Sequence, residues 1–185
     1  MVEPDLDADL SRLVSDSRAE EAARQRIRER NLRTAAVTDA TFSGVVVDLA
    51  ERGETVVVRT AHGRTLTGRI TLVARDAIAL ESGMGVSYIK LDRITAVRRA
   101  PGLRGDEPSG DRCPPRSISL AALLADLAQQ RPRVALVLAG EPALAVGELR
   151  AVGVDVHTVR LEGEPSVTAY FAAAQLSELT VLASG

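Results

Sequence analysis

Aromatic residues and cysteine are scarce in this chain of 185 residues. Tryptophan is absent, Tyr and Phe occur twice each, and Cys113 is the only cysteine. A hydrophobic core must therefore consist mainly of Val, Leu, Ile and Ala, and few rings are present to stack on nucleic-acid bases. A single cysteine excludes a disulfide within the chain and a metal site built from several cysteines. We therefore expect a reducing, cytoplasmic location.

Long apolar runs and a basic leader are lacking as well. No run approaches the roughly 18 apolar residues that a membrane helix needs, and the acidic residues near the start have the wrong charge for a signal peptide. The net charge is -2, whereas nucleic-acid binders usually carry a basic excess. With 45% apolar and 26% charged residues, the composition is typical of a soluble protein with one domain or two small ones.

No group of residues has the spacing of a catalytic, cofactor or metal site. His62 and His157 are the only histidines, and neither belongs to a ligand motif such as HxxxH. Asp76 and Asp155 suggest paired carboxylates for acid-base chemistry, but each begins a turn, where an Asp side chain commonly bonds to the backbone. We expect a protein that is not an enzyme and that uses no cofactor or metal.

The strongest positive signal is an internal repeat. Thr41 and Ser119 are helix N-cap candidates, and each is followed by apolar residues at i, i+3, i+4 and i+7. These two apolar sets are related by an offset of 78 residues: Phe42, Val45, Val46 and Leu49 in the first half, and Leu120, Leu123, Leu124 and Leu127 in the second. The pattern predicts two related modules, each beginning with a short helix.

Five strands are predicted after each helix. The first set covers residues 56–58, 64–74, 77–81, 86–91 and 94–97, and the second covers 134–138, 144–152, 156–161, 167–174 and 179–182. Gly68 and Gly147 lie within the second strand of each set, which predicts a sharp bend there. The offset grows to 79 at these glycines and to 85 near the end, where Leu176 and Leu179 correspond to Leu91 and Ile94.

The remaining segments differ in composition. Residues 5–33 combine spaced Leu, Ala and Ile with many acidic and arginine residues. This pattern predicts a charged helical arm that is either solvated and partly disordered, or forms a coiled coil or docks on a partner. Residues 99–116 contain four prolines and three glycines, which is typical of a flexible linker. The predicted organisation is a helical arm (1–35), a first module (36–98), a linker (99–116) and a second module (117–185).

The first module resembles the Sm-like family. Residues 55–68, with the sequence TVVVRTAHGRTLTG, resemble the first Sm motif, residues 76–80 (DAIAL) resemble the segment with its aspartate, and residues 88–95 (YIKLDRIT) resemble the second motif. The resemblance implies a mainly β protein with a helical arm (α+β), built from two tandem five-stranded small barrels that each follow a short helix. The whole chain is similar to an actinobacterial family of uncharacterised proteins with tandem Sm-like barrels.

The chain departs from the pattern of RNA-binding Sm-like proteins at two points. The spacing from Gly68 to Asp76 is about two residues longer, and Ala79 stands where an asparagine-type base contact is expected. The second module is also acidic, because residues 117–185 contain four basic and seven acidic residues, whereas residues 36–98 contain eight basic and seven acidic ones. Any RNA binding is therefore expected from the first module only.

Two functions follow from these observations. The first is a non-catalytic interaction or regulatory scaffold that binds a protein, itself or another, through strand edges or the N-terminal helix; in Sm-like proteins the fourth and fifth strands present such edges. The apolar run at 168–176 is either a buried strand or a docking edge. The alternative is RNA binding by basic residues and one ring of the first module, and the candidate contacts are Arg64, Arg69, Arg75, Tyr88, Lys90 and Arg93.

Overall fold

The computed structural model describes residues 21, 24–31, 34, 38, 40–102, 107–113, 117–140 and 144–183. The chain divides into two compact units, residues 1–40 and 41–185. In the first unit, residues 21, 24–31 and 34 are helical, in agreement with the predicted arm, and residue 38, which was predicted to belong to the first module, is helical as well; the rest of the arm lies outside the described residues. Among the described residues, no helix has both the length and the apolar character needed to cross a bilayer.

Both predicted helices of the repeat are confirmed, together with their caps. Helix α2 spans Phe42–Glu51, and the Thr41 hydroxyl accepts a hydrogen bond from the Gly44 amide at 3.0 Å. Helix α3 spans Leu120–Ala128, and the Ser119 hydroxyl accepts one from the Ala122 amide at 3.3 Å. In each case the cap satisfies an amide of the first turn that has no partner within the helix.

Five strands follow each helix in the order that the sequence predicts. After α2 come β1 (Thr55–Thr60), β2 (Thr65–Val73), β3 (Ala77–Ser82), β4 (Gly85–Lys90) and β5 (Ile94–Arg99), and after α3 come β6 (Arg133–Leu138), β7 (Ala145–Val152), β8 (Val156–Leu161), β9 (Thr168–Ala172) and β10 (Leu176–Leu182). Short 3-10 helices, η1 (Leu91–Arg93) and η2 (Ala173–Gln175), precede the last strand of each repeat.

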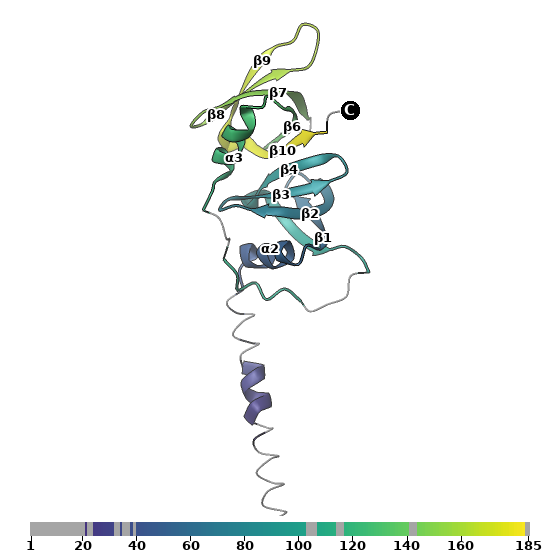
Figure 1. The fold of residues 1–185 in the computed structure, drawn as a ribbon, viewed down its shortest axis with the longest axis vertical. Helices are drawn as coiled ribbons and strands as arrows, with labels where there is room; N and C mark the ends of the chain where they lie inside the picture. Colours follow the sequence, from purple (N-terminus) through teal and green to yellow (C-terminus); the bar gives the residue numbers. More distant parts are fainter. Residues whose placement is uncertain are drawn as a thin grey trace, which may run out of the picture. The chain divides into compact units, whose positions relative to one another are not determined.

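The prediction of two closed Sm-like barrels is wrong. All ten strands form one open antiparallel sheet in the order β5-β1-β2-β3-β4-β10-β6-β7-β8-β9 (Figure 1). Closing a five-stranded barrel would require the last strand of each repeat to pair with the fourth strand of the same repeat. Instead, β4 pairs with β10 from the other repeat, which leaves β5 and β9 as the two edges of the sheet.

The strand registers also correct the end of the predicted alignment. Val58 pairs with Val97 in the first repeat, and Leu136 pairs with Leu179 in the second. Because Val58 and Leu136 are equivalent, Leu179 corresponds to Val97 and Leu176 to Ile94, an offset of 82 rather than 85. The same offset of 82 relates β4 to β9, since Ala79 pairs with Tyr88 and Thr158 pairs with Tyr170.

The two predicted strand glycines lie where a neighbouring strand comes very close. A Cβ on Gly68 would collide with the carbonyl oxygen of Glu81, and a Cβ on Gly147 would collide with that of Arg160. In both repeats the register between these strands shifts just beyond the glycine. Glycine therefore permits the strands to approach each other and bend at equivalent places.

The cores of the two repeats are not separate. One buried cluster lies wholly in the first repeat and includes Val46, Leu49 and Ile78. The other lies mainly in the second repeat, around Leu124 and Leu136, but it also contains Ala74 and Ala77 of the first repeat, and Leu72 and Tyr88 pack against it. Part of the first repeat is thus buried in the core of the second.

Candidate functional site

The two repeats are joined by the pairing of β4 with β10. The strands pair over five positions, from Glu178 opposite Ile89 to Leu182 opposite Gly85. In the buried part of this joint, the hydroxyls of Ser87 and Thr180 are 2.8 Å apart and hydrogen-bond to each other. The joint therefore combines backbone pairing with a specific side-chain contact.

The turn between β1 and β2 adds two polar contacts to the joint. The Nε and Nη2 atoms of Arg64 each donate a hydrogen bond of 3.3 Å to a different oxygen of the Glu178 carboxylate. Glu178 is 1% exposed, so its charge is compensated almost entirely by groups of the protein. Beside it, Nε2 of His62 and the Ser177 hydroxyl are 2.9 Å apart.

Next to the Ile89–Glu178 end of the joint, the turn between β2 and β3 holds the start of α3. The Asp76 carboxylate accepts a hydrogen bond of 2.8 Å from the Leu120 amide, and the Arg75 amide donates to the Ile118 carbonyl at 3.0 Å. The Lys90 ammonium donates to the Ala173 carbonyl at 2.8 Å. Asp76 thus acts on the helix of the other repeat, a contact that the predicted local turn did not include.

His157 lies in β8 close to this region. It is 2% exposed, and burial lowers its pKa, as does the positive charge of nearby Lys90. With Asp76, Lys90 and the first residues of α3, it lines a small hollow between the repeats. Within the described ranges, no three side chains of His, Cys, Asp or Glu lie together in a way that could hold a metal ion.

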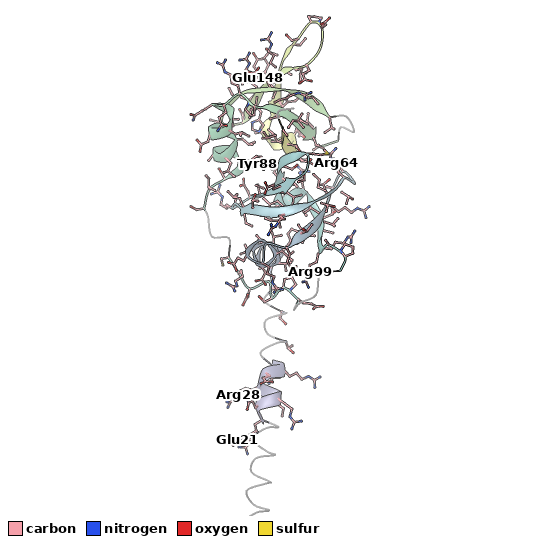
Figure 2. The ribbon with its side chains drawn as sticks, turned by 45° about the vertical axis from the view of Figure 1, so that its right-hand side comes forward. Glu21, Arg28, Arg64, Tyr88, Arg99 and Glu148 are labelled. Atoms are coloured by element: carbon pink, nitrogen blue, oxygen red, sulfur yellow. The ribbon has the colours of Figure 1, made fainter. Side chains whose placement is uncertain are left out.

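The six candidate RNA contacts are distributed over several places. Arg64, Tyr88 and Lys90 lie at the joint between the repeats, where their polar or apolar groups contact the second repeat. Figure 2 labels two of them, Arg64 and Tyr88. The Arg69 Nε donates to the Gly53 carbonyl at 2.8 Å, at the end of α2.

The last two candidates are also separate from each other. Arg75 is an exposed turn residue, and Arg93 lies 3.8 Å from Asp92 in η1. Three of the six side chains thus contact the second repeat, and the other three lie in β2, in the β2–β3 turn and in η1.

The two edges of the sheet are the surfaces left open by this arrangement. On β9, Tyr170 is 73% exposed, and Val154 in the preceding β7–β8 turn is fully exposed. On β5, Thr95, Ala96 and Arg98 are exposed. The apolar run at 168–176 therefore contains an edge strand, η2 and the start of buried β10.

The described part of the linker is held on α2. Asp48 in α2 accepts hydrogen bonds from the amide and the hydroxyl of Ser109, at 2.6 and 3.0 Å, and the Gly110 carbonyl accepts one of 2.9 Å from the Thr41 amide. Burial acts to raise the pKa of Asp48, but the hydrogen bonds from Ser109 and Gly110 and the charge of Arg52 outweigh it and lower the pKa.

Sequence reasoning missed these interactions for a simple reason. Arg64 and Glu178 are 114 residues apart, and Asp48 and Ser109 are 61 apart. The repeat did not reveal them either, because Asp48 and its counterpart Asp126 are the same residue, although Asp48 is buried and Asp126 is exposed. In comparisons with protein-family models, curated proteins and solved structures, none matched this chain.

Proposed function

We propose that this protein is a non-catalytic interaction scaffold that binds protein partners through the open edges of its sheet. The observation that carries the proposal is the β4–β10 joint, in which the chain already uses one pair of strand edges to join its two repeats. The equivalent strands, β9 and β5, lie at the ends of the sheet. Unpaired amides and carbonyls on an edge strand are ready to pair with an added strand.

The side chains on the β9 edge support the same proposal. An edge strand that is only structural is usually protected by charge or proline. β9 has the sequence TAYFA, without a charge or a proline, and its Tyr170 is 73% exposed. A large exposed ring on an uncharged edge is typical of a protein contact, because Tyr contributes much area at a small entropic cost.

Photocrosslinking from the edges tests the function. A benzophenone amino acid is placed at Tyr170 on β9, at Ala96 on β5, or at Met84, an exposed control in the β3–β4 turn. After irradiation of cells that make the protein, we expect adducts from the two edge positions that protease removes and nuclease leaves intact.

Two results would contradict the proposal. One is a set of adducts that is equally abundant from the Met84 control. The other is a set that nuclease removes, which would favour the RNA-binding alternative.

A further inference from the structure

We infer that the partner of these edges is a second copy of the chain, bound head to tail, so that β9 of one copy pairs with β5 of the next. This inference rests on the proposed function and names its partner. It follows from the two repeats, because β9 is equivalent to β4 and β5 is equivalent to β10. A contact of the kind seen between repeats would then recur between copies.

The internal joint gives the register of the contact between copies. Tyr88 pairs with Leu179 in the β4–β10 joint. Applying the offset of 82 to both strands places Tyr170 of one copy opposite Val97 of the next, in an antiparallel pair. The same rule places Ala169 opposite Arg98 and Phe171 opposite Ala96.

Apolar residues are exposed where the internal joint buries their counterparts. Leu120, at the start of α3, is 3% exposed against the first repeat, whereas its counterpart Phe42 at the start of α2 is 43% exposed. Tyr88 packs against the core of the second repeat, whereas Tyr170 is 73% exposed. Phe42 and Tyr170 lie on the two surfaces that a head-to-tail contact would bring together, which explains their exposure at both ends.

A helix cap would be repeated between copies as well. Asp76 caps α3 through the Leu120 amide, and its counterpart in the second repeat is Asp155. The backbone turns match, since the Asp76 carbonyl accepts from the Leu91 amide at 3.0 Å and the Asp155 carbonyl accepts from the Ala173 amide at 2.7 Å. The exposed Asp155 carboxylate is thus placed to accept from the Phe42 amide of the next copy.

Charge favours contact between unlike ends. The first repeat has one more basic than acidic residue, whereas the second has three more acidic than basic ones. The exposed acidic residues near the β9 end include Asp155 and Glu164, while Glu162 is paired with Arg133, and the β5 edge carries Arg98. Opposite charge across the contact would speed the encounter of two copies and oppose like-to-like pairing.

The contact between copies lacks the polar links of the internal joint. Glu178 corresponds to Ala96, Ser87 to Ala169, and Lys90 to Ala172, so equivalents of three side-chain contacts are missing. We therefore expect assembly that is weaker than the internal joint and depends on concentration. Because the contact joins unlike surfaces, it forms either a closed ring or an open chain of copies.

Sedimentation velocity of the full chain tests the inference. The wild-type protein should sediment faster as its concentration rises. Tyr170→Glu removes the apolar contact at the β9 end, and Phe42→Glu removes the one at the β5 end, where an acidic residue in the first turn suits the helix dipole. Each variant alone should remain a monomer, while Met84→Glu, with the same change of charge outside both ends, should assemble like the wild type.

Mixing the two variants is the decisive step. The Phe42→Glu protein keeps an intact β9 end and the Tyr170→Glu protein keeps an intact β5 end, so a 1:1 mixture should form dimers and nothing larger. Thermal unfolding of each variant alone confirms that it is folded.

Three results would overturn the inference: a wild-type protein that stays monomeric at hundreds of micromolar, assembly that neither substitution weakens, or a mixture without dimers. If edge crosslinks to a different protein are then found, the proposed scaffold function stands without self-assembly.

Discussion

Arg64 and Glu178 form an ion pair across the two repeats, in which one guanidinium holds both oxygens of a carboxylate that is 1% exposed. Arg64 lies in the β1–β2 turn of the first repeat and Glu178 in the last strand of the second. The pair thus connects two parts of the chain that the sequence presents as separate modules. Its removal is expected to weaken both repeats together.

The first prediction concerns this pair. Arg64→Ala leaves the Glu178 carboxylate buried, with the Thr180 hydroxyl donating to it at 3.2 Å as the remaining side-chain hydrogen bond among the described residues of the joint. We expect a loss of about 2 to 3 kcal/mol in the free energy of unfolding, less than for a fully buried pair because the Arg64 side chain is 32% exposed. Urea denaturation measures the change.

Two controls separate the buried charge from the loss of a side chain. In the Glu178→Gln background, Arg64→Ala should cost less than about 1 kcal/mol, because no buried charge is then left behind. Arg133→Ala breaks an ion pair with Glu162 whose side chains are 59% and 50% exposed, and because solvent screens this pair the stability should change much less than in Arg64→Ala. Equal losses for Arg64→Ala and Arg133→Ala would contradict the prediction.

The second prediction concerns pH and Asp48. Its pKa in the folded protein is lowered, so its ionised form stabilises the fold above the unfolded pKa of about 3.9, and this contribution disappears as the pH falls through the folded value. Asp48→Asn should lower the free energy of unfolding by about 1 to 2 kcal/mol at pH 7. The difference from wild type should shrink below about pH 4.

Asp126→Asn is the matched control, since Asp126 holds the equivalent place in α3 and is exposed. It should change the stability by less than about 0.5 kcal/mol at either pH. An Asp48→Asn effect that is constant from pH 7 to pH 3 would rule out the role of the ionised carboxylate.

The third prediction concerns the cap between repeats. Asp76→Ala removes the acceptor of the Leu120 amide and should cost about 1 kcal/mol, measured by thermal or urea unfolding. Asp155→Ala at a concentration where the protein is monomeric should cost less than about 0.5 kcal/mol, because the Asp155 side chain is exposed. If both substitutions cost the same, Asp76 acts only on its own turn.

The fourth prediction concerns the contact between the linker and α2. A Cβ on Gly44 would collide with the Gly110 carbonyl, so Gly44→Ala should displace residues 107–113 from the helix. Limited proteolysis should then cut this segment several times faster than in the wild type. Gly83→Ala, where a Cβ would meet nothing within 4 Å, should leave the rate unchanged. An unchanged rate in Gly44→Ala would show that the segment is not held there.

The elements of this fold could be read from the sequence, but their partners could not. Thr41 and Ser119 marked both helices because a cap is a local interaction between neighbours in the chain. Alternating apolar residues located the strands in the same way. The pattern on a strand indicates which face is buried, but it does not specify which strand lies beside it. The apolar pattern of the sequence therefore does not predict the β4–β10 pairing or the open sheet that results from it.

The candidate site shows the same limit. Lys90 and Tyr88 looked like a cation and a ring available to a ligand, because nothing near them in the sequence uses either group. Their contacts are to Ala173 and to the core of the second repeat, more than 80 residues away in the chain. Strand register shows that Tyr88 and Tyr170 are equivalent, with an offset of 82 residues. Comparison of the two halves of the sequence indicates an offset of 85 near the end of the repeat, which does not match these two residues.

The burial of Ala74 and Ala77 in the core of the second repeat has a consequence for how the protein can be divided. A break in the backbone between the repeats would cut no strand and would leave the β4–β10 pairing and the Arg64–Glu178 ion pair intact. Each half made by itself would expose a strand edge and part of a core. Once β4 and β10 are paired, the covalent connection between the halves is therefore dispensable. Two fragments, one for each repeat, should assemble into one molecule when they are expressed together.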